Sequence, residues 1–325
     1  MTQSAPTGLA PQPSRLALLA AAATGVQVGA AIVATRFVVH EVAPLTLALL
    51  RYAIGLLCLL PFAVQPLLAA RTRRLRGEAP SPRLLRDVVV MGLLGIGQFG
   101  VLIALMNFGL QHVGAAQAAL IFSLFPLFTL LLSAAWGHER ITPMLLAGVL
   151  LSILGVALSL APKLGAPHAS HWWGEAAVLC SAAIGALCSV LYRPYLRRYP
   201  TVPVSTFAMA ASVVFLALCA LPEQWPTRVL ALSPSTWAVV GFIGLSSGVG
   251  YFWWLYALKH ESPTRVTVFL ALNPVTAMVL STLLLGEPLS AWGVGAVASI
   301  GAGLWLATRQ PSSATAGLKP PGSQA

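Results

Sequence analysis

Six side chains inside long apolar stretches of the sequence have the chemistry to hold a small ligand. They are Gln27, Gln98, Ser247, Tyr251, Trp254 and Asn273. An amide placed in hydrocarbon is costly unless it bonds to a partner, to water or to a ligand. Aromatic rings can stack on the apolar part of a ligand, while amides and hydroxyls fix its polar end. We therefore expect these six residues to bind a substrate.

Arg51 is a further candidate for ligand contact. It stands about eight residues into an apolar stretch, which at the rise of a helix is roughly 12 Å below the membrane surface. A lone cation at that depth must reach the surface, meet backbone carbonyls or pair with an acid such as Glu41. Two interpretations stay open, an anchor to the interface and a contact with an anionic group of the substrate.

Pro126 and Pro274 fall near the centres of two other apolar stretches. Proline removes a backbone donor and frees the carbonyl of the preceding turn, which permits a kink. Each proline is therefore interpreted either as a hinge or gate of a moving helix or as ordinary packing, because proline is frequent in membrane helices.

Several kinds of chemistry are excluded by the sequence. It contains no Walker-type glycine loop and no His-Glu-x-x-His pair, and its four cysteines lack Cys-x-x-Cys spacing. Asp87, Glu175 and Glu261 lie at the ends of apolar stretches. We expect no metal, no cofactor and no enzymatic activity.

Composition indicates which solvent surrounds the elements that position these residues. Hydrophobic residues make up 58% of the 325 and charged residues 8%, too few to cover a water-soluble domain. The net charge of +11 comes from Lys and Arg in short interruptions between apolar runs. That pattern is typical of membrane loops rather than of a surface that binds nucleic acid. We expect an all-α membrane protein.

The apolar runs are about 20 residues long, the length that crosses a hydrocarbon core of roughly 30 Å. We expect ten transmembrane helices, at residues 16–38, 43–67, 87–110, 113–135, 142–161, 174–195, 202–221, 235–258, 262–285 and 290–308. The polar segments 1–15 and 309–325 are expected to be disordered tails.

Basic residues predict the orientation of these helices. Of the 19 Lys and Arg, 15 fall on the side that holds the N-terminus, Arg51 falls within a span, and three fall on the opposite side: Arg36, Lys163 and Arg228. Since basic loops stay in the cytoplasm, both termini are expected there, with the protein in a cell inner membrane.

Two stretches 148 positions apart read as variants of one another, LFPLFTLLLSAAWGHERIT (124–142) and LNPVTAMVLSTLLLGEPLS (272–290). Each has a proline and, thirteen residues later, a glutamate, Glu139 or Glu287. We expect each glutamate to cap the helix that follows it. Five spans separate the two copies, an odd number, so the halves must be inverted in the membrane, as in many secondary transporters.

The prolines, the WGHERIT and LGEPLS segments and the run APLTLALLRYAIGLLCLLP at 43–61 resemble the EamA-type members of the drug/metabolite transporter superfamily. The resemblance covers about residues 16–308. It implies ten helices in two inverted five-helix repeats around a central cavity, here 16–162 and 163–308.

The second half departs from the family pattern, because Ala210 stands where the first half has Arg51. The first span departs as well, with Gly25 and Gly29 in place of the Trp-Gly pair often seen there.

The expected function is secondary transport of a small neutral or zwitterionic metabolite, such as an amino acid, by alternating access through a central cavity. Export is implied by the resemblance, and efflux of drugs or lipid-like amphiphiles is the alternative. The expected partners are a small-molecule substrate and the lipid bilayer, without nucleic acid and with a homodimer left open. Every Asp, Glu and His lies in a tail, a loop or the first turns of a span, so we also expect facilitated diffusion or exchange without proton coupling.

Overall fold

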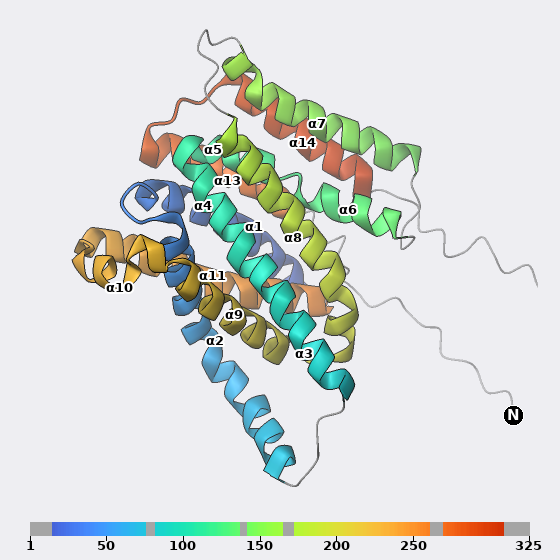
Figure 1. Cartoon of the computed structure of the whole chain (residues 1–325). Coiled ribbons are helices and arrows are strands. Elements are labelled where there is room, and N and C mark those ends of the chain that lie inside the picture. The colour runs from blue at the N-terminus through green and yellow to red at the C-terminus, as the bar shows by residue number, and fades with distance from the viewer. Residues whose placement is uncertain (1–14, 76–81, 137–141, 165–171, 261–268, 309–325) are drawn as a thin grey trace, which may run out of the picture.

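The computed structural model is all-helical over the residues that it describes, which are 15–75, 82–136, 142–164, 172–260 and 269–308 (Figure 1). The expected tails, apart from Arg15, and the expected cap Glu139 lie outside these residues. We refer to 15–164 as the first half and to 172–308 as the second half.

The first half contains α1 (Arg15–Val38), α2 (Pro44–Leu75), α3 (Pro82–Gly95), the π-helical η1 (Ile96–Val101), α4 (Leu102–His112), α5 (Ala115–Phe122), α6 (Phe125–Ala135) and α7 (Pro143–Leu164). The second half begins with α8 (Trp173–Arg198), α9 (Thr201–Cys219), η2 (Leu221–Glu223), α10 (Trp225–Arg228), η3 (Val229–Ala231) and α11 (Pro234–His260). It continues with η4 (Phe269–Ala271), α13 (Leu272–Leu280), the π-helical η5 (Ser281–Leu285) and α14 (Ala291–Thr308).

Six helical segments are long and apolar enough to cross a membrane: Arg15–Val38, Pro44–Phe62, Arg86–His112, Ala115–Ala135, Trp173–Tyr192 and Val202–Cys219. A seventh is a bent pair, Trp225–Ala231 and Pro234–Trp254, with a bend of 117°. The described residues also form three shorter apolar helices, Leu146–Ala161, Leu272–Leu285 and Ala291–Leu306. Each of the ten expected spans overlaps one of these segments, whereas ten full crossings and the inversion of the halves stay predictions.

Two of the expected spans are irregular next to their prolines. α5 ends at Phe122 and α6 begins at Phe125, and Pro126 lies in the first turn of α6, where no amide donor is needed. In the second half the 3-10 turn η4 runs directly into α13, whose third residue is Pro274. The backbone thus changes geometry at both positions, while movement there as a hinge or gate stays a prediction.

The first helix packs closely against the second half because two glycines face it. A methyl group at Gly29 would lie 2.5 Å from the carbonyl oxygen of Asn273, and one at Gly25 would collide with the carbonyl of Phe269. Small residues allow membrane helices to approach each other closely. α1 also packs on α11, α2 packs on α9 and α11, and α7 and α14 lie side by side at one edge of the bundle (Figure 1).

Every acidic side chain that the structure describes bonds to the opposite half of the chain. Thr236 donates to Glu41, Arg198 and Tyr199 donate to Asp87, Gln117 donates to Glu175, the backbone amides of Leu45 and Thr46 donate to Glu223, and those of Ala115 and Ala116 donate to Glu287. Glu223 and Glu287 therefore cap the N-termini of α2 and α5, two helices of the first half.

One sequence-based expectation about these acids is wrong, and one alternative that the sequence left open is not realised. Glu287 caps α5 and not the helix that follows it, because the Oγ atom of Ser290 accepts the amide of Gly293, at 3.0 Å, at the start of α14. Glu41 does not pair with Arg51, since its carboxylate accepts a hydrogen bond from Thr236 across the two halves.

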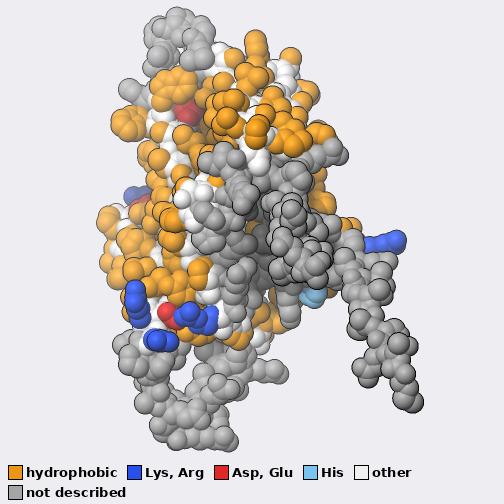
Figure 2. All heavy atoms as spheres, turned by 90° about the vertical axis from the view of Figure 1, so that its right-hand side faces the viewer, with side chains coloured by type: hydrophobic (Ala, Val, Ile, Leu, Met, Phe, Trp, Pro, Cys, Tyr) orange, Lys and Arg blue, Asp and Glu red, His pale blue; other side chains and the backbone are white. Residues whose placement is uncertain are grey.

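The described surface is mostly hydrophobic, as Figure 2 shows for one face. Large apolar side chains such as Leu93, Val214 and Leu283 are 62–73% exposed on three different helical segments. In water this surface would be unstable, whereas lipid solvates it without cost. The Lys and Arg side chains visible on this face gather mainly near one end of the bundle (Figure 2).

Candidate functional site

A cavity of about 190 Å³ lies in the middle of the bundle, between the two halves. Its walls come from α1, α2, η1, α4, α5, α6, α8, α9, α11 and η4. The lining residues are Thr24, Gln27, Val28, Ile32, Arg51, Tyr52, Gln98, Phe99, Leu102, Ile103, Met106, Phe122, Phe125, Ser189, Met209, Ser247, Gly250, Tyr251, Trp254 and Leu270.

Five of the six residues expected from the sequence line this cavity: Gln27, Gln98, Ser247, Tyr251 and Trp254. Asn273 does not belong to the lining. It is 2% exposed on α13, and its carbonyl lies against Gly29 where α1 and α13 pack. Depth in the membrane therefore led to five residues of this lining, and substrate binding by them stays a prediction.

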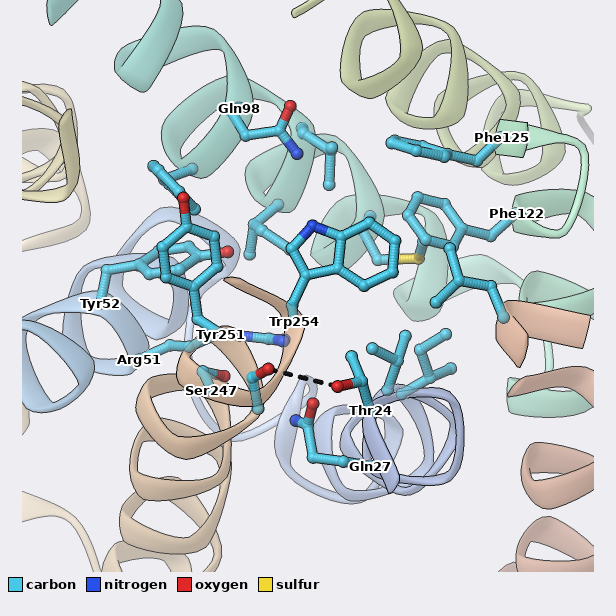
Figure 3. A pocket seen from close by; sticks show the side chains of 18 of the residues that line it. Thr24, Gln27, Arg51, Tyr52, Gln98, Phe122, Phe125, Ser247, Tyr251 and Trp254 are labelled. Carbon is cyan, nitrogen blue, oxygen red and sulfur yellow. Dashed lines mark hydrogen bonds between the residues drawn. The ribbon is translucent and has the colours of Figure 1, made fainter. Parts of the chain in front are cut away.

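The polar part of the cavity is built by α1, α2 and α11. Gln27 donates from Nε2 to the Oγ atom of Ser246 at 3.1 Å, and Thr24 donates to the carbonyl of Gly250 at 3.4 Å. Ser247 donates to a carbonyl of its own helix, at 2.6 Å from Ile243. Figure 3 shows Thr24, Gln27, Arg51 and Ser247 on one side of the cavity.

Aromatic rings form two groups on the other walls. Phe99 contacts both Tyr52 and Tyr251 edge to face, each with ring centroids 5.2 Å apart. Tyr251 is held by a hydrogen bond of 2.9 Å from its hydroxyl to Ser205 on α9. Phe122 and Phe125 form the second group, with centroids 5.6 Å apart, and the Trp254 ring lies between the two groups in Figure 3.

The helix interruptions place several of these side chains. Gln98 and Phe99 stand on the π-helical turn η1, and Phe122 and Phe125 flank the break before Pro126. Extra or missing residues in a helix rotate the side chains that follow, and π-helical turns are frequent at functional sites. Pro126 thus acts on the cavity through its neighbours, since it is not among the lining residues.

Two buried polar atoms of the cavity wall have no hydrogen bond within the described part of the chain, Nε of Arg51 and Oε1 of Gln98. The Arg51 side chain is 9% exposed, and its guanidinium lies 5.8 Å from the centre of the Tyr52 ring. Buried polar atoms are normally satisfied by protein or by water, so these two atoms are open to a water molecule or a ligand.

The two halves contribute wall residues at matching positions. Phe99, Leu102, Ile103 and Met106 all line the cavity, and so do the residues 148 positions later, Ser247, Gly250, Tyr251 and Trp254. The first-half wall is apolar, while the second-half wall carries a hydroxyl, a phenol and an indole. The repeat has therefore kept its geometry and diverged in its chemistry.

The sequence reading missed the apolar and aromatic lining, including Tyr52, Phe99, Phe122 and Phe125. Such residues are common in every membrane span, so their type alone carries little information. The spacing of 148 residues between the repeats could have identified part of this lining, because it maps Ser247 onto Phe99 and Tyr251 onto Ile103. In the part of the chain that the structure describes, no group of three or more His, Cys, Asp or Glu side chains could hold a metal ion.

Comparison with known proteins relates this architecture to a family. The model of the EamA-like transporter family matches residues 15–161 and again residues 172–309. An uncharacterized transporter of Archaeoglobus fulgidus is 27% identical over 87% of this chain and 95% of its own length. A probable terminal-alkyne amino-acid exporter of Streptantibioticus cattleyicolor is 31% identical over 62% of this chain and 67% of its own.

A solved crystal structure shares the fold. It superposes with a TM-score of 0.60 over 90% of this chain and 96% of the other, at 24% sequence identity. Both family matches together cover most of the chain, and the family consists of transporters rather than enzymes. The chain is therefore a multi-pass membrane protein that belongs to the EamA-like transporter family.

Proposed function

We propose that this protein exports a small zwitterionic metabolite of the amino-acid class by alternating access through the central cavity. The observation that carries the proposal is the cavity itself, which lies between the halves and combines a few polar groups with largely apolar and aromatic walls. Ligand sites are typically apolar with a small number of placed polar groups.

The size of the cavity favours a small cargo. Its volume of about 190 Å³ is below the roughly 300–1,000 Å³ of pockets that hold drug-sized ligands. It corresponds to about six water molecules at about 30 Å³ each. Efflux of large amphiphiles, the alternative function, would require a substantially wider state.

The matched walls support alternating access. Cavity-lining positions on η1 and α4 recur 148 residues later on α11, so each half presents an equivalent surface to the centre. Rocking of one repeat against the other around a fixed central site is the usual mechanism of repeat-built carriers. Export as the direction is supported by the relative named as a probable amino-acid exporter.

Counterflow in proteoliposomes tests the proposal. Vesicles that contain the purified protein are loaded with one unlabelled amino acid at a time and supplied with a trace of the same labelled compound. We expect transient accumulation of at least one amino acid with an apolar or aromatic side chain. Failure of all twenty amino acids would refute the proposal, and competition by tetraphenylphosphonium would instead favour the efflux of amphiphiles.

A pair of variants links transport to the cavity. Ile103→Trp fills the cavity from a side chain that is 8% exposed, whereas Leu93→Trp adds the same ring at a position that is 63% exposed on α3. We expect counterflow to be lost in the first variant and retained in the second, at similar membrane abundance. Equal counterflow in both variants would place the transport path elsewhere.

A further inference from the structure

Arg51 is a buried cation without a counter-ion in the described part of the chain. It lies on α2, its side chain is 9% exposed, and no hydrogen bond or ion pair joins its guanidinium to a described residue. Arginine stays charged at any physiological pH and offers five donors in a planar fork. A charge inside a membrane protein is expensive unless it pairs, so Arg51 calls for a functional explanation.

The neighbouring groups do not supply the missing anion. Glu41, one acid that could have paired with Arg51, bonds to Thr236 instead. None of the described residues that line the cavity is acidic. The Tyr52 ring, 5.8 Å from the guanidinium carbon, gives a partial compensation through its π-electrons but leaves the N–H donors unused.

An unpaired acceptor lies on the same cavity. The Oε1 atom of Gln98 is buried and accepts no hydrogen bond from a described residue. In Figure 3 the amide nitrogen of Gln98 points toward Trp254 and the oxygen points away, so a half-turn of the amide brings the acceptor to the cavity. Figure 3 shows Arg51 and Gln98 on different sides of the cavity, with Tyr251 and Trp254 between them in this view. A guanidinium fork is the complement of a carboxylate, and a neutral amide oxygen is the complement of an ammonium group.

We propose that Arg51 binds the carboxylate of the cargo and that Gln98 accepts a hydrogen bond from its amino group, with the cargo side chain directed to the apolar wall of Phe122 and Phe125. The inference rests on the proposed function and specifies which groups recognise the cargo. A guanidinium binds a carboxylate through two parallel hydrogen bonds, which fixes its orientation as well as its affinity.

The asymmetry of the halves limits the cargo to one carboxylate in this site. When PLTLALLR (44–51) is aligned with PVSTFAMA (203–210), Ala210 takes the place of Arg51, and its neighbour Met209 lines the cavity. A dicarboxylate would therefore bring one anionic group that the described lining cannot pair. The carboxylate dominates recognition, because Arg51 carries a full charge and Gln98 carries none.

Binding of four probes to the purified protein tests this site: L-phenylalanine, 3-phenylpropionate, L-phenylalaninamide and phenethylamine. The first two carry the carboxylate and the last two lack it, while all four share the phenyl ring. We expect saturable binding of both carboxylates and at least about tenfold weaker binding of the other two, in line with the strength of hydrogen bonds to charged groups. Absence of binding by both carboxylates, or equal binding of all four probes, would overturn the proposal.

Variants of Arg51 test the same point from the protein side. Arg51→Gln should weaken the binding of both carboxylates by about tenfold or more and leave the affinity for phenethylamine unchanged. Arg51→Lys, which keeps the charge but not the fork, should give an intermediate loss. Arg228→Gln is the matched control, because it removes an exposed arginine of α10 outside the cavity. Identical affinities in Arg51→Gln and Arg228→Gln would overturn the proposal.

The two proposals can fail separately. Equal transport of an amino acid by the wild-type protein and by Arg51→Gln would refute the carboxylate site and leave the proposed function intact. A protein that binds 3-phenylpropionate through Arg51 but moves no amino acid would refute the proposed function and leave the site intact. If Arg51→Gln does not fold, the comparison of the four probes on the wild type still decides the proposal.

Discussion

Gln98 shows at the residue scale how the site trades stability for binding. Its amide oxygen is buried on the π-helical turn η1 without a donor in the described structure. A buried polar atom left unsatisfied costs about 1–3 kcal/mol. Gln98 lines the cavity, so a ligand that donates to the turned amide could restore the hydrogen bond.

Replacement of Gln98 by leucine should therefore separate stability from function. We expect the melting temperature of the ligand-free protein to rise, by a stability gain on the order of 1 kcal/mol, and counterflow to fall. The matched control is Gln111→Leu, which breaks the hydrogen bond of 3.2 Å from Gln111 to the Val39 carbonyl and should lower the melting temperature. Equal destabilisation by the two substitutions, measured by a thermal-shift assay, would contradict this reading.

The polar residues of the site were predictable because a membrane span contains so few of them. Gln27, Gln98 and Ser247 were identified by depth and chemistry, and all three line the cavity. Asn273 met the same criteria but does not line the cavity, because depth does not determine rotation about the helix axis, and its backbone carbonyl packs against Gly29. Phe122 was not predictable by type, since an aromatic residue faces lipid as readily as a cavity.

At the element scale, local backbone irregularity determines which side chains reach the cavity. From the sequence, Pro126 and Pro274 were either hinges or ordinary packing residues, and both lie beside a change of helix type. It did not predict the π-helical turn η1, because the run 87–110 contains no proline. A π-helical turn depends on how neighbouring helices pack, which a single sequence does not record.

The glycines of α1 provide a prediction at this scale. Gly29→Leu should push α1 away from α13, because even a methyl group would lie 2.5 Å from the Asn273 carbonyl, and overpacking typically costs about 1–3 kcal/mol. Gly301→Leu on α14 is the control, since nothing lies within 4 Å of a Cβ atom added there. We expect Gly29→Leu to lower the amount of monodisperse protein in size-exclusion chromatography and Gly301→Leu to leave it unchanged. The reverse order would contradict the packing described for α1.

At the scale of the whole molecule, the repeat was the most informative feature of the sequence. It predicted two related halves, and the family model matches the chain twice, at 15–161 and 172–309. The all-helical architecture followed from the apolar runs. The contacts between the halves were not predicted from the sequence. Glu287 was expected to cap a helix of its own half, whereas in the structure it bonds to α5 of the other half.

The orientation in the membrane is a testable expectation from the distribution of basic residues. Arg83→Cys, at the start of α3, should react with a membrane-impermeant maleimide only after the cells are permeabilised. Leu230→Cys, at a position 86% exposed in η3, should react in intact cells. Both substitutions belong in a background from which the four native cysteines have been removed. Labelling of both positions in intact cells would refute the predicted topology.

Energy coupling is the second expectation for the whole molecule. Among the described residues that line the cavity, none is an Asp, a Glu or a His. A carrier that exchanges protons with its substrate needs a titratable group close to the binding site. We therefore expect an imposed pH gradient alone to cause no accumulation of a transported amino acid in proteoliposomes with equal concentrations inside and outside. Accumulation under that condition would show that a proton site exists and that facilitated diffusion is the wrong model.

The capping of first-half helices by glutamates of the second half also has a consequence for how the protein is made. Synthesis proceeds from the N-terminus, so α2 and α5 leave the ribosome before Glu223 and Glu287 have been translated. Until then their first amides must be held by water or by lipid head groups. The newly inserted first half thus lacks two of its helix caps until the second half has been made. We expect a chain terminated after α8 to expose these helix ends to the quality-control proteases of the membrane.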